Sequence, residues 1–559
     1  MLPFSILSLL FLGASGRRYV SPPSSISSPI AIPLHVQPRD VNAGTTTLSG
    51  ITPLTVSSDR QTYFAVIQAG SINFRVALDT ASSDLWIMAS TCSTSSCAAV
   101  PRYPLTYESP TFGVVNDNKT VFEARYADGT VASGFVARES VRLANLTLTD
   151  QVFGVVTDSN LTMLDDVSGI MGLGFPRLSG IPNSVTNSTP FFPSLAQQGI
   201  LDYPLFGLSL TNNASGTLTL GAIDTAIVTN ISMIGWNKVV EFAPTGLESN
   251  ESSYLQWATP LSVFMVNGKQ FSPLPTYANN TGNASLALFD IGTSGIYGPY
   301  QDVERLFAQI DGARLVDDDG QWAIPCDTTA SISFTFGQQN YTLQPTDYLI
   351  GPASGNPKIC LTWPRALSPS SDGIDWQFGG PFLRTVYSIF SYGINSKEAP
   401  LIGFFPLNTA TETVGTASVA SFLSSISAIV ATTLPNSLLS IPTFTTPAYG
   451  FNSSIKASTG GIVFSALATS TYSPIFGKKI ANVTSLPAIT PQATVTTIIL
   501  TNAQGDVTTS TSTYSAASIA LGVPPGWSAG GVVHIPHMLA IFIWPVLSLT
   551  SLFAMDLIL

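Results

Sequence analysis

Two aspartates that end apolar runs are the residues of this sequence best suited to catalysis. Asp79 lies in Val76-Ala77-Leu78-Asp79-Thr80-Ala81-Ser82, and Asp290 lies in Leu286-Ala287-Leu288-Phe289-Asp290-Ile291-Gly292-Thr293. Two carboxyl groups that share one site cannot both ionise freely, because at ~3 Å and an effective dielectric constant near 20 their repulsion is roughly 5 kcal/mol. The ionised group can take a proton from water while the protonated group donates to a carbonyl oxygen. Such a pair can hydrolyse amide bonds without histidine or metal.

The two aspartate segments belong to a weak internal repeat. In each, a small residue stands two positions after the aspartate and a hydroxyl residue three positions after it. Well beyond each turn an uncharged run ends in glycine, at Ile170-Met171-Gly172 and at Gln377-Phe378-Gly379. The repeat predicts two related lobes, and packing about a pseudo-two-fold axis would bring Asp79 and Asp290 together at their seam.

Short β-like runs punctuated by glycine, asparagine and proline fill the body of the chain, as at Tyr63–Gln68 and Ile332–Phe336. Helical stretches are few, and the two clearest, Pro193–Gln198 and Gln301–Ile310, have a proline at or just before their start. We therefore predict an all-β fold with few short helices, in which residues 59–225 form an N-terminal lobe and residues 226–408 a C-terminal lobe.

The composition excludes several classes of protein. The chain has 559 residues, of which only 10% are charged, and its net charge is −11. With 22 Lys and Arg against 33 Asp and Glu and no basic run, it lacks the positive surface that a phosphate backbone requires, so we expect no nucleic-acid partner. Of three histidines only His35 lies outside the C-terminal segment, which disfavours histidine-dependent nucleophiles and zinc sites. We expect no metal, no cofactor, and a monomer that acts on polypeptide substrates.

Both ends of the chain carry sorting patterns. Residues 2–12 are apolar and small residues follow them, which predicts a signal peptide over residues 1–16, with an ordinary buried segment as the alternative. Met538–Leu559 is apolar and follows the small triplet Ser528-Ala529-Gly530 and a short spacer, the layout of a glycosylphosphatidylinositol (GPI) attachment signal over residues 526–559. A plain membrane span is the alternative, which Asp556 within the apolar stretch disfavours. We expect a secreted protein anchored through Ser528 at the plasma membrane or in the cell wall.

Two low-complexity regions flank the body. Residues 17–55 are rich in Pro, Ser and Thr and show no core pattern, which predicts an N-terminal extension or short propeptide. Residues 409–525 are dominated by Ser, Thr, Ala, Ile and Pro, which is typical of an O-glycosylated stalk. Within this stalk, Val495–Leu500 and Val507–Thr511 could pair as a hairpin.

The four cysteines suit an oxidising compartment. Three pairings are possible, and the local one, Cys92 with Cys97 and Cys326 with Cys360, is the most economical because each bond closes a loop within one region. N-glycosylation sequons are frequent and favour a glycosylated surface protein; they include those that begin at Asn118, Asn145, Asn283 and Asn340.

Over most of residues 60–407 the sequence resembles the pepsin-like aspartic proteases. Asp79-Thr80-Ala81-Ser82-Ser83-Asp84-Leu85-Trp86 is similar to the family's first catalytic motif with Ala in place of Gly. Asp290-Ile291-Gly292-Thr293-Ser294 is similar to the second, with Ile in place of Thr or Ser. Tyr126-Ala127-Asp128-Gly129-Thr130 resembles the hairpin flap that closes over substrate. Together with the GPI signal, the likeness is greatest to the yapsin-like cell-surface branch of fungi.

The resemblance implies a bilobal fold with a cleft between the lobes and a role for each matching residue. Asp79 and Asp290 would be the catalytic pair, and Tyr126 the flap tyrosine that contacts Trp86. The family's disulfides fall at Cys92–Cys97 and Cys326–Cys360. Its late glycine motif matches Gly379-Gly380-Pro381-Phe382-Leu383-Arg384, with Gly380 in place of the usual Asp. The residues that would support the carboxylates are Thr80, Ser82, Gly292 and Thr293.

Two departures from the family pattern bear on activity. Ala81 keeps the main-chain N–H that the family directs at the carboxylate but adds a Cβ in a crowded turn. Ile291 lacks the hydroxyl that this position contributes to a reciprocal hydrogen-bonded grip between the lobes. These departures favour the alternatives, a catalytically inactive pepsin-fold binding protein or a wall protein in which the stalk matters most. The retained aspartates and Tyr126 favour the function that we predict, that of an endopeptidase that works at acidic pH.

Overall fold

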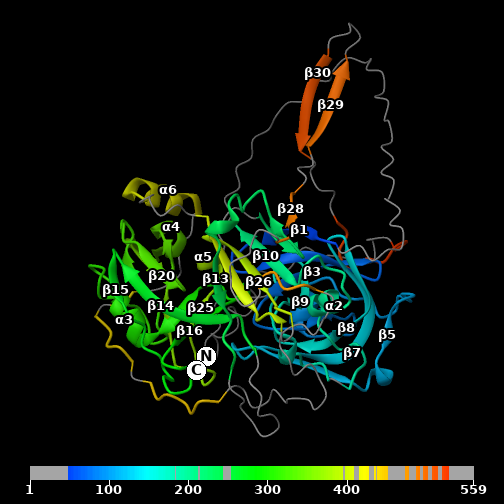
Figure 1. Cartoon of the computed structure of the whole chain (residues 1–559), viewed down its shortest axis with the longest axis horizontal. Helices are drawn as coiled ribbons and strands as arrows, with labels where there is room; N and C mark the ends of the chain where they lie inside the picture. The colour runs from blue at the N-terminus through cyan, green and yellow to red at the C-terminus, as the bar shows by residue number, and fades with distance from the viewer. Residues whose placement is uncertain are drawn as a thin grey trace, which may run out of the picture. The chain divides into compact units, whose positions relative to one another are not determined.

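The computed structural model describes residues 48–182, 184–211, 215–242, 254–394, 397–407, 414–426, 434–435, 437–442, 444–450, 472–476, 486–491, 495–501, 507–513 and 519–527. The predicted signal peptide, Ser528 and the apolar C-terminal stretch lie outside these residues. Strands dominate the described chain and its helices are short (Figure 1), which confirms the predicted all-β fold.

One sheet of 14 strands runs through both lobes. Its members, in spatial order, are β13 (Gly235–Lys238), β27 (Leu401–Pro406), β26 (Val386–Ser391), β10 (Leu205–Leu210), β11 (Ser215–Leu220), β1 (Gly50–Val56), β2 (Tyr63–Ala69), β3 (Ile72–Asp79), β9 (Val167–Gly172), β4 (Leu85–Met88), β8 (Leu146–Ser159), β7 (Val131–Leu143) and β5 (Gly113–Val114), with β6 (Val121–Arg125) paired to β7.

The middle of this sheet joins the lobes. β10 of the N-terminal lobe pairs antiparallel with β26 of the C-terminal lobe, so that Phe206 lies opposite Phe390. The two rings stack with centroids 4.8 Å apart, and Trp257 packs edge-on against Phe390 at 5.2 Å. The seam behind the predicted site is therefore a continuous hydrogen-bonded sheet with an aromatic core, not a loose contact between two domains.

The extension predicted for residues 17–55 ends in a strand of this sheet. β1 pairs with β11 from Gly50 to Thr55, and its buried residues, Gly50, Thr52 and Leu54, alternate with more exposed ones. The expectation that this stretch has no core pattern is wrong from Gly50 onward, because two of the three buried positions are glycine and threonine and give no apolar signal.

The C-terminal lobe adds an eight-stranded sheet and a smaller one. The larger contains, in order, β21 (Gln339–Leu343), β20 (Ile332–Phe336), β14 (Ala258–Val266), β16 (Ser285–Phe289), β25 (Ile374–Phe378), β17 (Ile296–Pro299) and β24 (Arg365–Leu367), with β15 (Lys269–Phe271) on β14. The smaller contains β18 (Arg314–Leu315), β19 (Trp322–Pro325), β23 (Asn356–Thr362) and β22 (Leu349–Ala353).

The helices lie where proline and amphipathic patterns place them. α2 (Phe191–Gln197) and α3 (Tyr300–Phe307) match the two predicted helical stretches. α3 buries one face through Val303, Leu306 and Phe307, the spacing of an amphipathic helix. The remaining α-helices and 3₁₀ turns are α1 (Ser95–Ala98), α4 (Pro345–Tyr348), α5 (Gly380–Leu383), α6 (Thr416–Ile426), η1 (Asn116–Asn118), η2 (Pro176–Leu178) and η3 (Ile231–Met233).

The internal repeat corresponds to one strand pattern used twice. β3 runs parallel to β9 and β4 antiparallel to it, and β16, β25 and β17 repeat this arrangement. The loop after each aspartate passes so close to the later strand that only glycine fits there. A Cβ on Gly172 would lie 2.4 Å from the Ser83 carbonyl carbon, and one on Gly379 would lie 1.8 Å from the Thr293 oxygen.

Apart from the predicted hairpin, the described parts of the region predicted to be a stalk pack on the body. Val419 of α6, Tyr472, Phe476 and Leu486 are buried, and β28 (Ala488–Ile489) pairs with β12 (Ile223–Asp224). A purely Ser/Thr-rich spacer would have nothing to bury, but this segment carries apolar and aromatic residues at intervals. The predicted hairpin is present as β29 (Val495–Thr501) paired with β30 (Val507–Thr513) (Figure 1).

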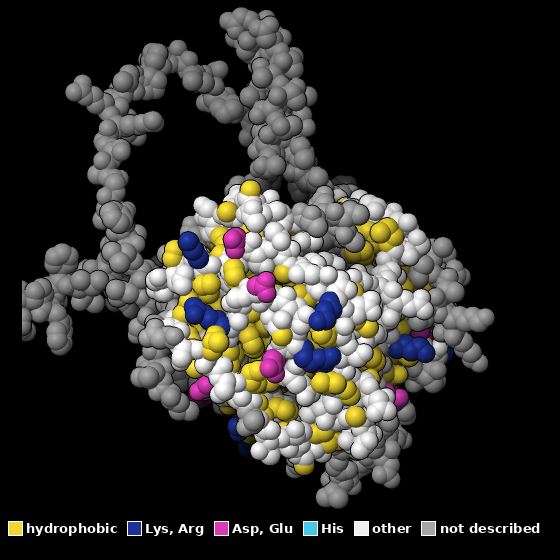
Figure 2. Space-filling model, turned by 90° about the vertical axis from the view of Figure 1, so that its left-hand side faces the viewer, with side chains coloured by type: hydrophobic (Ala, Val, Ile, Leu, Met, Phe, Trp, Pro, Cys, Tyr) yellow, Lys and Arg dark blue, Asp and Glu magenta, His cyan; other side chains and the backbone are white. Residues whose placement is uncertain are grey.

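The surface is sparsely charged. On the face shown in Figure 2, Lys, Arg, Asp and Glu side chains are scattered singly among polar and apolar ones. Across the described ranges, no helix is long and apolar enough to cross a membrane.

Candidate active site

The fold brings the two repeated aspartates together at the seam. Asp79 is the last residue of β3, and Asp290 directly follows β16. Both are buried, with 8% and 6% of their surface exposed. Gly292 lies against both carboxyl groups, since a Cβ built on it would be 3.1 Å from Asp79 Oδ1 and 3.3 Å from Asp290 Oδ1. A side chain at position 292 would therefore crowd the space between them.

Matching donors hold each carboxyl group. The Ala81 N–H donates to Asp79 Oδ1 at 2.8 Å, and the Gly292 N–H donates to Asp290 Oδ1 at 2.9 Å. The Ser82 hydroxyl donates to Asp79 Oδ2, and the Thr293 hydroxyl donates to Asp290 Oδ2 at 2.7 Å. These bonds restrict the rotation of both side chains and leave the pair facing one another. Ala81 thus keeps the N–H contact that glycine would make.

Thr80 links the two lobes beside the aspartate pair. The Thr80 hydroxyl donates to the Phe289 carbonyl at 3.0 Å and accepts the Ile291 N–H at 3.1 Å. The Thr80 N–H also donates to Asp290 Oδ1 at 3.1 Å. On the other side Ile291 is only 1% exposed and joins the main hydrophobic core. At this position, apolar packing of the Ile291 side chain replaces the hydrogen bond that a hydroxyl would make.

Burial keeps a proton on the pair into the neutral range. Desolvation, followed by the neighbouring Asp290 charge, raises the pKa of Asp79 to about 7, and the bonds from Ser82 and Ala81 oppose that rise. The site therefore combines a protonated carboxyl and a second carboxyl in contact with it, the arrangement that general acid and base catalysis requires. Within the described residues, no group of three or more His, Cys, Asp or Glu is placed to hold a metal ion.

The segment that resembles a flap is a hairpin. β6 pairs antiparallel with the start of β7, from Val121 opposite Phe135 to Arg125 opposite Val131, and the turn between them closes with the Tyr126 N–H donating to the Thr130 carbonyl at 3.0 Å. Trp86 is fully buried on β4, and its Nε1–H donates to the Tyr126 hydroxyl at 2.7 Å. This bond fixes the tyrosine where the turn of the flap begins, next to the strand that leads away from Asp79.

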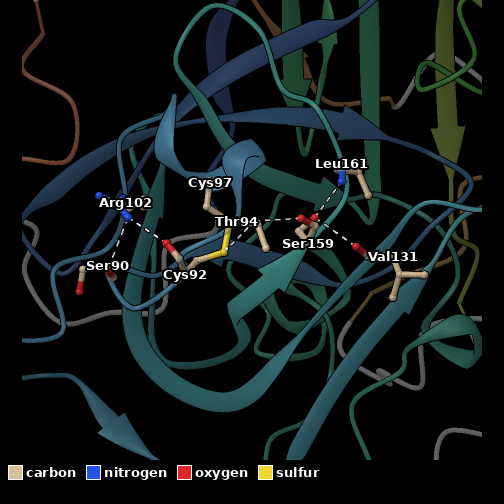
Figure 3. The surroundings of a disulfide bond; sticks show 8 residues. All are labelled: Ser90, Cys92, Thr94, Cys97, Arg102, Val131, Ser159 and Leu161. Carbon is tan, nitrogen blue, oxygen red and sulfur yellow. Dashed lines mark hydrogen bonds between the residues drawn. A yellow bond between two sulfur atoms is a disulfide. The ribbon is translucent and has the colours of Figure 1, made fainter. Parts of the chain in front are cut away.

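The first disulfide supports the same hairpin. Cys92 bonds to Cys97 in the loop after β4, and Thr94 between them donates to the Ser159 carbonyl at 3.0 Å. Ser159 in turn donates through its hydroxyl to the carbonyl of Val131, where the second flap strand begins (Figure 3). The other bond joins Cys326 to Cys360. The local pairing predicted from the sequence is confirmed.

Several supporting residues were not singled out from the sequence. The Leu173 N–H donates to the Asp79 carbonyl at 2.7 Å, and the Leu173 carbonyl accepts from Trp257 Nε1 at 2.9 Å and from the Tyr392 hydroxyl at 2.6 Å. The two aromatic residues come from the C-terminal lobe and brace the strand beside Asp79. A buried aromatic residue is a normal core residue, so no local pattern marks these two as partners of the site.

Asp84 is a second buried carboxyl near the site. It accepts hydrogen bonds from the Ser179 hydroxyl at 2.6 Å and the Gly180 N–H at 2.7 Å. Burial raises its pKa to about 6 despite these bonds. Its position within the first motif could have marked it, but the motif alone does not say which residues it would bind.

The late glycine motif places Gly380 next to the guanidinium group of Arg384. A Cβ on Gly380 would lie 3.0 Å from Arg384 Nη1, where the family has an aspartate. Arg384 Nε is buried without a hydrogen-bond partner among the described residues. Glycine at position 380 therefore offers the neighbouring guanidinium no side-chain acceptor.

Comparisons with known proteins agree with this geometry. A family model described as "Eukaryotic aspartyl protease" matches residues 62–399. Similar proteins include an aspartic protease of Phaffia rhodozyma, 30% identical over 352 residues that cover 62% of this chain and 77% of that protein. Major aspartyl peptidase 1 of Cryptococcus neoformans is 29% identical over 57% of this chain and 64% of its own length. Cathepsin E of Mus musculus is 28% identical over 60% and 78%.

Proposed function

Because the chain belongs to the eukaryotic aspartyl protease family, we propose that it is a secreted, GPI-anchored endopeptidase that hydrolyses peptide bonds at acidic pH. The observation that carries the catalytic part of this proposal is the matched set of donors around Asp79 and Asp290. A structural aspartate pair would not need both carboxyl groups buried, in contact and held by equivalent bonds on each side.

The chemistry follows from the shared proton. A water molecule held between the carboxyl groups loses a proton to the ionised one as its oxygen attacks the peptide carbonyl carbon. The protonated carboxyl of the pair donates to the carbonyl oxygen. The tetrahedral intermediate then expels the amine, which takes a proton from the pair, and the C–N bond breaks. Tyr126 and Trp86 hold the flap above this exchange.

The test is removal of either half of the pair. Asp79→Asn and Asp290→Asn should each reduce pepstatin-sensitive cleavage at acidic pH to below a few per cent of wild type. The substrates are denatured protein and a synthetic peptide. The exposed Asp311→Asn is the matched control and should retain full activity. Circular dichroism should show all three variants folded. Residual activity well above that level in a folded dyad variant would contradict the assignment.

The alternative function, an inactive binding or wall protein, takes its support from Ala81 and Ile291. Since the Ala81 N–H still reaches Asp79 and Thr80 still bridges to Ile291, we expect Ala81→Gly/Ile291→Thr to change kcat/KM by less than about tenfold, or roughly 1.4 kcal/mol. An inert wild type together with a double variant that cuts would establish the natural protein as a pseudoprotease.

Secretion and anchoring rest on the sorting patterns of residues 1–16 and 526–559. Two disulfides and the exposure of the sequon residues Asn118, Asn145, Asn283 and Asn340 support passage through the secretory route. We place the protein in the yapsin-like cell-surface branch, as a glycosylated monomer at the plasma membrane or in the cell wall. Phospholipase C specific for phosphatidylinositol should release it, and deletion of Met538–Leu559 should send it to the medium. Retention after that deletion would indicate a different anchor.

A further inference from the structure

The tail that follows the peptidase body is long enough to be a spacer. Residues 408–527, if free and extended, would span on the order of 400 Å and would lift the body far from any anchor at Ser528. Apart from the β29–β30 hairpin, however, each described stretch of the tail from 434 to 527 contacts the body. We name these stretches, residues 434–435, 437–442, 444–450, 472–476, 486–491 and 519–527, the belt.

The belt begins on the C-terminal lobe. Leu434 packs on the small cluster of Val316, Ala323 and Leu361. Phe444 then stacks on Tyr300 of α3 with ring centroids 4.4 Å apart. Tyr277 donates its hydroxyl to the Pro447 carbonyl at 2.8 Å, and its ring packs against Tyr449 at 5.3 Å. These contacts involve both backbone and rings, so the register of the segment on the lobe is defined.

The belt then reaches the sheet that joins the lobes. The buried Tyr472 donates its hydroxyl to the Leu201 carbonyl at 2.9 Å. The Phe476 N–H donates to Glu398 Oε2 at 2.8 Å, and its ring lies 4.6 Å from that of Trp236 on β13. Further along, β28 runs parallel to β12 as an added strand. Because Glu398 and Trp236 flank the strands at the seam, the belt is attached to the middle of the body as well as to its C-terminal lobe.

The belt ends on the N-terminal lobe. Leu521 bridges to Asn73 at the start of β3, and the Gly522 N–H donates to the Asn73 carbonyl at 2.9 Å. Gly522 passes so close to the body that a Cβ there would lie 2.8 Å from Pro101. Trp527, the last described residue, packs edge-on against Tyr107 with centroids 6.2 Å apart. The chain thus arrives at Ser528 while still in contact with the body.

We propose that the anchored protein holds its peptidase body directly against the lipid surface, with the edge around Tyr107 and Trp527 facing the head groups. The inference rests on the proposed GPI anchoring. A single peptide step separates Trp527 from the anchored residue, about 3.8 Å between Cα atoms, so the docked belt leaves no polypeptide spacer between the body and the glycan of the anchor. Trp527 and Ile519 are 49% and 52% exposed on this segment, and tryptophan is the residue that membrane–water interfaces favour.

The belt's path also sets what the enzyme can reach. A body tethered by a long stalk could sweep a thick layer of the cell wall, whereas a body seated on the membrane meets only polypeptides within its own width of the lipid. The substrate class we infer is therefore membrane-proximal protein and not polypeptide held at the outer face of the wall.

The test measures the distance between this edge and the lipid. The four native cysteines form disulfides, so Glu108→Cys, at an exposed position next to Tyr107, provides the single free thiol, which can carry a fluorescent donor. The full anchored protein is placed in phosphatidylcholine vesicles that contain an acceptor-labelled lipid. The comparison protein has a 30-residue Gly/Ser linker inserted between Trp527 and Ser528, which adds an average reach of roughly 30 Å.

We expect efficient energy transfer in the wild-type arrangement and about a twofold or greater loss with the linker. Leu521→Asp, which puts a charge where the belt meets Asn73, should lower the transfer in the same direction by releasing the end of the belt. Equal transfer with and without the linker, whether high or low, would overturn the inference. Phospholipase C treatment of the same vesicles separates the two proposals: vesicles that do not release the protein refute the anchor itself, and with it this arrangement.

Discussion

Replacing Thr80 with valine tests the one-sided grip between the lobes. Thr80 is fully buried, and its hydroxyl is the acceptor for the Ile291 N–H and a donor to the Phe289 carbonyl, at 3.1 and 3.0 Å. Valine has nearly the same shape, so it removes these bonds without opening a cavity. In a site with a reciprocal grip the opposite hydroxyl would retain half of the bonding, but Ile291 has none to offer.

The loss of stability can be calculated from the two backbone groups that lose the Thr80 hydroxyl as a partner. A buried N–H that loses its partner costs about 1–3 kcal/mol, and the lost bond to the carbonyl adds about 1 kcal/mol, so Thr80→Val should reduce the free energy of unfolding by roughly 2–4 kcal/mol. At about 2 °C for each kcal/mol in a protein of this size, Tm should fall by roughly 4–8 °C. Since the same hydroxyl lies 3.1 Å from Asp290 Oδ1, kcat/KM should also fall, by about tenfold or more.

Thr80→Ser is the matched control. It keeps the hydroxyl and loses one methyl group, which corresponds to about 1 kcal/mol of buried apolar surface. Calorimetry at acidic pH and turnover of a quenched fluorescent peptide give both quantities for the two variants. If the valine and serine variants unfold at the same temperature and cut at the same rate, the hydroxyl does not hold the lobes and the reasoning fails.

Three further perturbations test other features of the structure. Burial raises the pKa of Asp84 from 3.8 to about 6, so its contribution to stability is complete below pH 4 and is lost as the pH rises through 6. Other buried carboxyls, among them Asp79, lose stability over the same range; in urea unfolding at pH 4 and pH 7, Asp84→Asn should therefore make the loss smaller than in wild type by on the order of 3 kcal/mol, and an unchanged loss would contradict the assignment. Phe476→Ala in the belt should lower stability by about 3 kcal/mol in calorimetry, whereas the exposed Ser473→Ala should have no effect, and equal melting temperatures would show that the tail is a free spacer. Gly380→Asp should raise Tm by about 2 °C by pairing with Arg384, and the uncharged Gly380→Asn should not, so a gain in both variants would argue against an ion pair.

The sequence alone was sufficient to predict features whose residues lie close together in the chain. Each aspartate, the small residue two positions on and the hydroxyl three positions on form one turn, so their spacing alone places the N–H and O–H donors that Asp79 receives from Ala81 and Ser82. The same holds for the bond between Cys92 and Cys97 and for α3, where one amphipathic period decides which face is buried. The repeat of these turns was enough to predict that two such sites exist and face one another.

Only the tertiary structure decided what depends on contacts between distant segments. The membership of β1 in the large sheet rests on pairing with β11, and glycine and threonine at its buried positions carry no apolar signal. The support that Trp257 gives to the strand beside Asp79 is a hydrogen bond across 84 residues, which no spacing encodes. Above all, composition made the tail look like a stalk because composition averages over a window, whereas docking is determined by a few aromatic residues such as Phe476 that meet a matching surface. Short-range spacing determines which groups can do chemistry, and long-range packing determines where the chain that carries them is held.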